Sequence, residues 1–94
     1  MNESGISLEK IQEWLVQTVS LLVEVPEEVN VESKTDEMGV LFTLKVAQKD
    51  AGKVIGKMGN TAKALRALLR VMGMNKSARI NLKIDVPELQ GDGY

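Results

Sequence analysis

The residues with the clearest potential for ligand chemistry form the tetrapeptide Gly56-Lys57-Met58-Gly59. Glycine has no side chain, so a sugar-phosphate backbone can approach the peptide chain closely at these positions. A predicted helix follows at once, and the free N–H groups and partial positive charge of a helix start favour a phosphate. The lysine of the tetrapeptide adds a full charge, and Lys53 and Lys63 lie on either side. This pattern predicts a site for a phosphate backbone, a contact that gives affinity without base specificity.

The tetrapeptide lies in a strongly basic part of the chain, although the 94 residues together have a net charge of only −1. Residues 45–83 contain ten lysines and arginines and one acid, which gives +9, whereas residues 1–44 carry −7 and residues 84–94 carry −3. A polyanion responds to the local block and not to the average. Charged faces that only keep a surface in water are the alternative explanation.

Composition excludes most enzyme chemistry. The chain has no histidine, the commonest general base and metal ligand, and no cysteine for disulfides or thiolate metal sites. The tetrapeptide also lacks the longer Gly-x-x-x-x-Gly-Lys-Ser/Thr spacing of nucleotide hydrolases. Asp50 is the one nearby carboxylate, so there is no pair for metal or acid–base work. We therefore expect no catalysis, no cofactor and no bound metal.

No segment has the features of a membrane span or an export signal. The longest apolar runs are four or five residues, against about 20 needed to cross a bilayer. Residues 1–5 have neither the basic region nor the apolar region of a signal peptide. The simplest expectation is a cytoplasmic protein without membrane contact.

The first element is a predicted helix that starts at Leu8, with Ser7 as N-cap, and that Pro26 ends. Its apolar residues recur at spacings of three and four, which gives one stripe. The stripe comprises Leu8, Ile11, Leu15, Val19 and Leu22, widened by Trp14 and Leu21. The tryptophan is accordingly expected in the core or at an interface.

Three strands are predicted from the alternation of apolar and polar side chains. Residues 29–34 and 40–46, joined by a turn at residues 35–39, form an antiparallel hairpin. Residues 79–86 alternate most regularly, and Pro87 closes this last strand.

Two helices separate the second strand from the third. Asp50 can cap a very short helix over residues 51–55, which the first glycine of the tetrapeptide stops. Asn60 or Thr61 caps a longer helix, which Gly73 ends. The apolar face of this longer helix consists of Ala64, Leu65, Leu68, Leu69 and Met72.

The element order is therefore α-β-β-α-α-β, and the fold class is α+β. Helices join the last two strands, which is the crossover that parallel neighbours require. The expected architecture is a three-stranded mixed sheet with three helices packed on one face. Residues 7–86 form this single domain, with flexible ends at residues 1–6 and 87–94.

Base recognition would need a groove beside the tetrapeptide. Val54 or Ile55, together with apolar residues of the last strand, would form its floor, and Arg79, Asn81 and Lys83 would offer hydrogen bonds from its edge.

Other charged residues leave two explanations open. Arg66 and Arg70, one helical turn apart, either follow phosphates or keep that face in water, and Lys76 is similarly ambiguous. The acids of the first helix are expected on a solvated face that points away from nucleic acid: Glu9, Glu13 and Glu24.

The segment Gly52-Lys53-Val54-Ile55-Gly56-Lys57-Met58-Gly59 resembles the signature of the KH domain, and the element order is similar to its type II, or prokaryotic, arrangement. The resemblance covers residues 7–86 and is strongest to the small stand-alone KH proteins of bacteria. It implies that the GXXG loop clamps about four nucleotides of single-stranded RNA or DNA. It further implies an RNA chaperone or post-transcriptional regulator, linked to cell elongation and division. Such proteins pair with themselves or with a larger KH-containing partner.

The expected RNA-binding residues are the loop, the apolar pair before it and the surrounding polar or basic side chains. They are Gly56, Lys57, Met58, Gly59, Lys53, Val54, Ile55, Asn60, Lys63 and Arg79. Met58 departs from the family, whose loops commonly carry a polar, basic or glycine residue there. The methionine could touch a base, a sugar or a protein partner.

A protein-interaction module that keeps the fold without the nucleic acid is the alternative function. Leu21, Val23 and Met38 exceed what a small core can bury, which favours a homodimer or partner surface.

Overall fold

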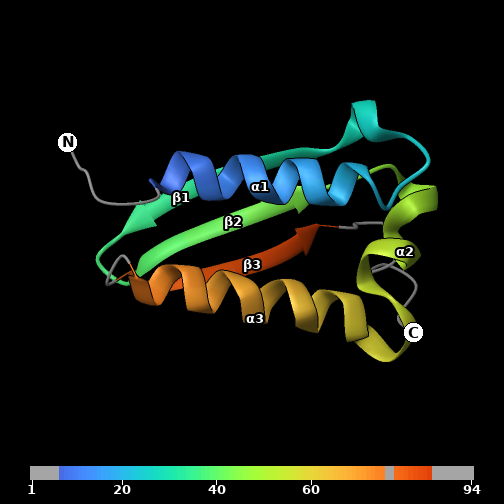
Figure 1. The fold of residues 1–94 in the computed structure, drawn as a ribbon. Helices are drawn as coiled ribbons and strands as arrows, with labels where there is room; N and C mark the ends of the chain where they lie inside the picture. Colours follow the sequence, from blue (N-terminus) through green and yellow to red (C-terminus); the bar gives the residue numbers. More distant parts are fainter. Residues whose placement is uncertain (1–6, 76–77, 86–94) are drawn as a thin grey trace.

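The computed structural model describes residues 7–75 and 78–85. The elements follow the order α1 (Leu8–Ser20), β1 (Asn30–Asp36), β2 (Gly39–Lys45), α2 (Ala51–Ile55), α3 (Asn60–Asn75) and β3 (Ile80–Asp85) (Figure 1). Short 3₁₀ turns at Pro26–Glu28, Gln48–Asp50 and Lys57–Gly59 join them. The predicted order and the α+β class are confirmed. The ends expected to be flexible, residues 1–6 and 87–94, and Lys76 lie outside the described residues.

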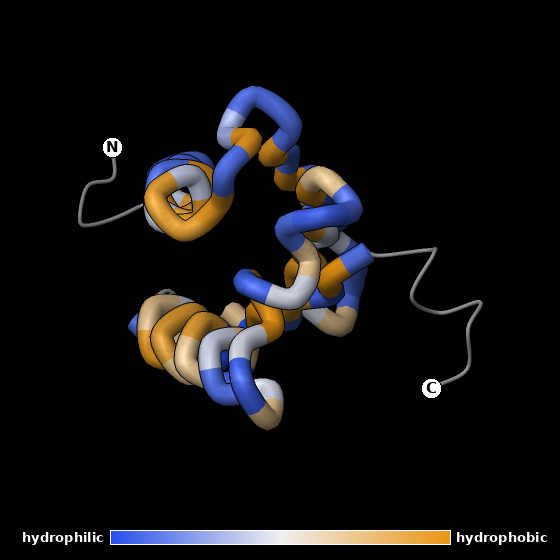
Figure 2. Tube along the Cα trace, turned by 90° about the vertical axis from the view of Figure 1, so that its right-hand side faces the viewer, coloured by the Kyte–Doolittle hydropathy of each residue, from blue (hydrophilic) through white to orange (hydrophobic). Residues whose placement is uncertain are grey.

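The sheet has the strand order β1-β2-β3. β1 is antiparallel to β2 and places Val31 opposite Leu44, whereas β3 is parallel to β2 and places Leu82 opposite Phe42. The mixed sheet predicted from the helical crossover is therefore confirmed. Helices α1 and α3 lie on the same face of the sheet, and α2 lies at the end where β2 leaves it (Figure 1, Figure 2). Since β3 pairs with β2 alone in the described part of the chain, one edge of β3 is open.

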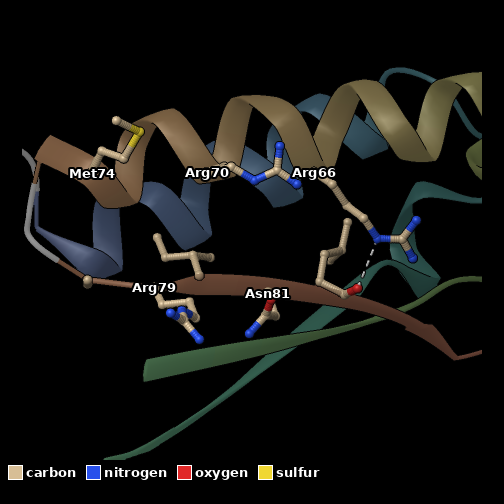
Figure 3. Close-up of a pocket in the computed structure, with 8 residues that line it drawn as sticks. Arg66, Arg70, Met74, Arg79 and Asn81 are labelled. Carbon is tan, nitrogen blue, oxygen red and sulfur yellow. Dashed lines mark hydrogen bonds between the residues drawn. The ribbon is translucent and has the colours of Figure 1, made fainter. Parts of the chain in front are cut away.

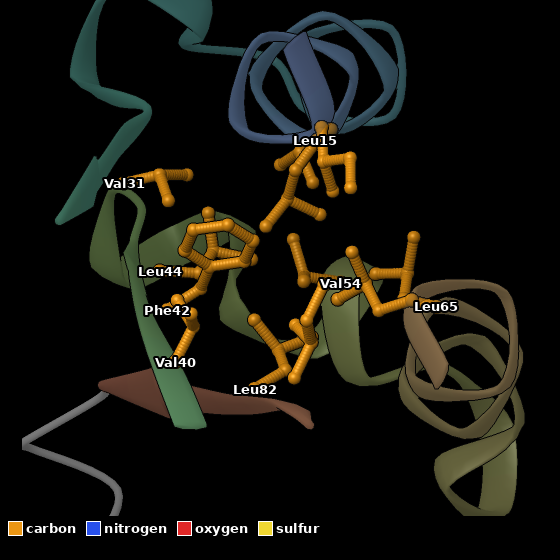
Figure 4. Close-up of a cluster of buried hydrophobic side chains, with 12 residues drawn as sticks. Leu15, Val31, Val40, Phe42, Leu44, Val54, Leu65 and Leu82 are labelled. Atoms are coloured by element: carbon orange, nitrogen blue, oxygen red, sulfur yellow. The ribbon is translucent and has the colours of Figure 1, made fainter. Parts of the chain in front are cut away.

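One hydrophobic core joins the sheet to all three helices (Figure 4). Its largest fully buried apolar side chains are Phe42, Ile11, Leu15, Leu44, Leu69, Val19 and Val54. Val54 comes from the five-residue helix α2 and anchors that helix to the core. Trp14 is half-buried and packs against this cluster, as predicted.

Helix α1 is shorter than predicted. Ser7 is the N-cap as expected, since its Oγ accepts the N–H of Lys10 at 3.2 Å. The helix, however, ends at Ser20 and not at Pro26. Leu21, expected to widen the buried stripe, is 87% exposed, and Leu22 is 40% exposed. Apolar residues continue at helical spacing beyond Ser20, but the backbone there leaves the helix, and the amides of Glu24 and Val25 bond Asp50.

The β-hairpin is tighter than predicted. Only residues 37–38 form the turn, because Asp36 already pairs with Gly39. The Asp36 carboxylate accepts the N–H of Met38 at 2.7 Å, a local bond that closes the turn. The alternation of β1 is also less informative than it looked, since Val31 is its one buried side chain.

Helix α3 continues past Gly73 to Asn75, so this glycine does not end it. A Cβ at Gly73 would lie 2.5 Å from the carbonyl oxygen of Ala78 and 3.1 Å from Cγ1 of Ile80. The glycine therefore lets the start of β3 pack directly against the helix. Of the predicted apolar face, Leu65 and Leu69 are buried as expected, but Leu68 is 48% exposed, and Ala64 is exposed too.

Asp50 is fully buried and does not cap α2. Its two carboxylate oxygens instead accept the backbone N–H groups of Glu24 and Val25, each at 3.0 Å. The predicted capping role is wrong because both carboxylate oxygens accept these amides, which are distant in sequence, and neither bonds the first turn of α2. The contact ties the loop after α1 to the start of α2.

Replacing Gly73 by alanine should destabilise the protein, because the added methyl group would meet the backbone of Ala78. We expect a loss of about 1–3 kcal/mol in unfolding free energy, measured by urea denaturation. Gly52→Ala is the matched control, since nothing lies within 4 Å of its Cβ position. That variant should gain about 0.5–1 kcal/mol, because alanine is the better helix residue. Equal stability of the two variants would contradict the packing role of Gly73.

Replacing Asp50 by alanine should leave two backbone N–H groups without their acceptor. We expect a loss of about 2–4 kcal/mol in unfolding free energy, and a smaller loss for Asp50→Asn, which keeps one acceptor oxygen. Urea denaturation of both variants tests this. A loss below about 0.5 kcal/mol for Asp50→Ala would show that water replaces the carboxylate and that the tie is unimportant.

Candidate nucleic-acid interface

The loop Gly56–Gly59 turns the chain between α2 and α3 with positive φ angles, which residues other than glycine rarely adopt. Three of its residues have positive φ: Gly56 at 82°, Met58 at 56° and Gly59 at 76°. Two backbone bonds brace it, from the N–H of Gly56 to the carbonyl of Gly52 at 2.8 Å and from Gly59 to Gly56 at 3.0 Å. Met58 is the only non-glycine residue with positive φ among the described residues, so its backbone carries some strain.

The two glycines serve different purposes. A Cβ on Gly56 would lie 2.3 Å from Oγ1 of Thr61, so this glycine allows the loop to pack on the first turn of α3. A Cβ on Gly59 would meet nothing nearer than Cε of Lys63 at 3.9 Å. We expected open space for a ligand beside both glycines. The space beside Gly59 is open, whereas the space beside Gly56 is filled by Thr61.

Helix α3 begins directly after the loop. Asn60 has helical backbone angles, φ −68° and ψ −37°, so it is the first residue of the helix and not its cap. The prediction that Asn60 or Thr61 caps α3 is therefore wrong, because the glycine-rich turn leads into the helix without a side-chain cap. Lys57, Asn60 and Lys63 are all exposed around this helix start. They surround the place where the helix dipole favours an anion.

The apolar pair before the loop is divided between core and surface. Val54 is fully buried in the hydrophobic core, whereas Ile55 is half-buried. Of the two, only Ile55 reaches the surface beside the loop. Met58 is 83% exposed at the loop tip, where it can touch a ligand or a partner.

Lys53 is engaged in an ion pair that the sequence did not indicate. Its ammonium group lies 2.5 Å from Oε2 of Glu24, and the ammonium of Lys49 lies 3.2 Å from Oε1 of the same carboxylate. The hydrogen bond from Lys53 contributes most to holding the pKa of Glu24 below its ordinary value, and Glu24 in turn raises the pKa of Lys53. Glu24 was expected on helix α1, facing away from nucleic acid. It lies instead in the loop after α1, beside α2, because Asp50 holds its backbone there.

A basic groove runs between α3 and the open edge of β3 (Figure 3). Its described lining residues include three arginines and no acid: Arg66, Arg70, Met74, Ala78, Arg79, Ile80, Asn81 and Leu82. The Nε–H of Arg66 donates to the carbonyl oxygen of Leu82 at 3.2 Å, which bridges the helix to the strand edge. Arg66 and Arg70, one helical turn apart, both line this groove beside the edge strand.

Arg79 does not lie beside the loop. It precedes β3, next to the C-terminal end of α3, whereas the loop precedes the N-terminal end of that helix (Figure 1). Arg79 and Asn81 both line the basic groove, on the side of β3 away from α3 (Figure 3). Lys83 is exposed further along the same strand. The predicted site residues therefore fall into two groups. One surrounds the loop, and the other, Arg79 and Asn81, lies at the end of the groove away from the loop.

Within residues 7–75 and 78–85, no three His, Cys, Asp or Glu side chains lie close enough together to hold a metal ion. Among the same residues, the helices are too short or too polar for any of them to cross a membrane.

Comparison with known proteins places this fold and loop in a family. A family model described as "KhpA/KhpB, KH domain" matches residues 12–84, from within α1 to within β3. RNA-binding protein KhpA of Clostridium acetobutylicum is 39% identical over 71 residues, which cover 74% of this chain and 95% of that protein. RNA-binding protein KhpA of Chlamydia pneumoniae is 36% identical over 74 residues, covering 79% and 95%. That of Listeria monocytogenes is 34% identical over 74 residues, covering 79% and 97%.

The resemblance to small stand-alone KH proteins of bacteria is thereby confirmed, and the order of elements agrees with the type II arrangement. The matched residues include the whole loop at 56–59. This chain belongs to the KhpA/KhpB family of KH domains.

Proposed function

We propose that this protein binds short single-stranded RNA and that the loop Gly56–Gly59 holds the RNA backbone. The observation that carries the proposal is the loop itself: it leads straight into the 16-residue helix α3, with open space beside Gly59 and exposed Lys57. A phosphate there would meet the positive end of the helix dipole and a full charge. The relatives' name, RNA-binding protein, supports the same conclusion.

The basic groove extends the proposed interface along α3. With the backbone held at the loop, the following nucleotides run toward Arg66 and Arg70, and bases reach the edge of β3 at Asn81. A contact of about four nucleotides is the expected size for a KH domain. Such a small contact suits reversible binding, so we further propose a role as RNA chaperone or post-transcriptional regulator in the cytoplasm.

The double substitution Lys57→Asp/Met58→Asp should abolish binding of a short single-stranded RNA and leave the fold intact, because two acids at the loop tip repel the phosphates. Fluorescence anisotropy with a labelled 12-nucleotide RNA of mixed sequence measures the binding. Affinity of the natural protein should fall steeply with salt, as released counterions drive the interaction.

The matched control is Lys34→Asp/Met38→Asp, which makes the same two changes at exposed positions of the β-hairpin. The hairpin turn lies at the opposite end of the molecule from the loop (Figure 1). The control should bind RNA nearly as well as the natural protein. Equal loss in both variants would show that only overall charge matters, and unchanged binding in the loop variant would refute the loop assignment.

Pairing with a second copy of the chain is a second candidate function, and one surface of α3 favours it. Residues at spacings of three and four form an exposed apolar stripe on this helix, which we name the outer stripe: Ala64, Leu68, Val71 and Met74, the last of which lies at the border with the basic groove. Val71 is 57% exposed and Met74 is 71% exposed, more than an isolated small domain needs to leave in water. The helix thus presents a core face, a basic groove face and an apolar face. Antiparallel packing of two outer stripes about a two-fold axis would cover both copies at once.

The substitution Val71→Asp should convert a dimer to a monomer, since it places a charge in the middle of the outer stripe. Sedimentation velocity of the full chain, with and without RNA, measures the oligomeric state. Thr35→Asp, at an exposed position of the hairpin, is the control and should leave the dimer intact. A natural protein that sediments as a monomer, or a Val71→Asp variant that remains a dimer, would contradict this surface assignment.

A further inference from the structure

Glu24 lies between two lysines in an arrangement that resembles a bound phosphate. Each of its carboxylate oxygens pairs with a different ammonium group, Oε1 with Lys49 at 3.2 Å and Oε2 with Lys53 at 2.5 Å. A phosphodiester also presents two non-bridging oxygens that share one negative charge. The lysine pair is therefore already spaced to hold an anion with two oxygens.

The position of Glu24 is fixed by the fold and not only by the lysines. Its backbone N–H is held by the buried carboxylate of Asp50 at 3.0 Å, and the N–H of Val25 is held by the second oxygen of Asp50. The two lysines stand on the 3₁₀ turn Gln48–Asp50 and on α2. Because α2 leads directly into the loop, Lys53 lies about one helical turn before the proposed RNA clamp and Lys49 one turn earlier.

The ion pair is open to exchange. The side chains of Glu24, Lys49 and Lys53 are 57%, 63% and 44% exposed, so solvent screens their attraction and a competing anion can reach the lysines. Exposed ion pairs contribute little to stability. Breaking this pair is therefore a small obstacle to a polyanion that brings several charges at once.

We propose that Lys49 and Lys53 form a second phosphate-binding position beside the loop, which the Glu24 carboxylate occupies in the free protein and an RNA phosphate occupies in the complex. The inference rests on the proposed RNA binding. Lys53 also lies 3.8 Å from Oδ1 of the buried Asp50. On binding, the RNA phosphate takes over the two ammonium contacts that Glu24 makes, and the displaced Glu24 repels it. Glu24 thus acts as an internal competitor that weakens RNA binding at this position, while its backbone stays in place through Asp50.

The test is Glu24→Gln, which removes the charge, keeps the side-chain shape and leaves the backbone bond to Asp50 available. Binding of the labelled 12-nucleotide RNA should become tighter by about threefold, the effect of removing one like charge at close range in a solvated site. The slope of log affinity against log salt should steepen only slightly, because the same phosphate is bound in both proteins and only the displaced carboxylate of the natural protein takes up a cation on binding. Circular dichroism and thermal unfolding confirm that the variant is folded.

Two comparisons separate competition from a general charge effect. Glu13→Gln, at an exposed position of α1, makes the same charge change away from the lysine pair and should leave affinity nearly unchanged. In a Lys49→Gln/Lys53→Gln background, Glu24→Gln should have no effect, because the site it blocks is gone. Weaker or unchanged binding in Glu24→Gln, or equal tightening in the lysine-deficient background, would overturn the inference.

The loop variant Lys57→Asp/Met58→Asp distinguishes this failure from failure of the proposed function. If RNA binding depends on the loop but not on Glu24, the second phosphate position is refuted and the loop clamp is supported. If the loop variant binds RNA normally but Glu24→Gln binds it more tightly, the lysine pair is supported as the anion site and the loop clamp is refuted.

Discussion

The carboxylate of Asp50 is completely buried, and both of its oxygens accept backbone N–H groups from the loop that follows α1. Removing a carboxylate from water is costly unless hydrogen bonds replace its hydration, so this residue requires the loop to stay where it is. The loop in turn places Glu24 against Lys49 and Lys53. One buried side chain thereby fixes the N-terminal half of the chain against the short helix from which the RNA-binding loop emerges.

Helix α2 needs this support because it is too short to be stable alone. Its five residues bury Ala51 and Val54 against the core, and Gly56 then turns the chain onto the first turn of α3. The open positions that remain, Lys57, Met58 and the space beside Gly59, are those that a ligand would meet. Rigid anchors before and after the loop reduce the conformational entropy that the loop loses when it binds a ligand.

Much of this architecture follows from local sequence patterns. Alternation located all three strands, the cap at Ser7 located the start of α1, and Gly56 located the end of α2. These signals work because burial on one face and backbone conformation at glycine act within a few residues.

Features that depend on contacts between distant segments were predicted wrongly or missed. Helix α1 ends at Ser20, before Pro26, and the chain after it places the N–H of Glu24 on Asp50, 26 residues further along the sequence. Gly73 looked like a helix stop but serves the packing of β3 on α3. From the charge pattern, Lys53 was expected to contact RNA and Glu24 to lie away from it, whereas the fold pairs the two side chains. A single sequence does not show which oppositely charged residues tertiary structure brings together.

The proposed interface places the RNA backbone at the loop between α2 and α3 and the rest of the strand along the groove beside β3. Titration of ¹⁵N-labelled protein with a short single-stranded RNA, followed by amide chemical shifts, tests it most directly. We expect the largest shifts at the amides of residues 56–60, with smaller ones at Arg70 and Asn81 along the groove. Shifts confined to Ala64, Leu68 and Val71 of the outer stripe or to β1, with the loop amides unmoved, would be incompatible with this interface.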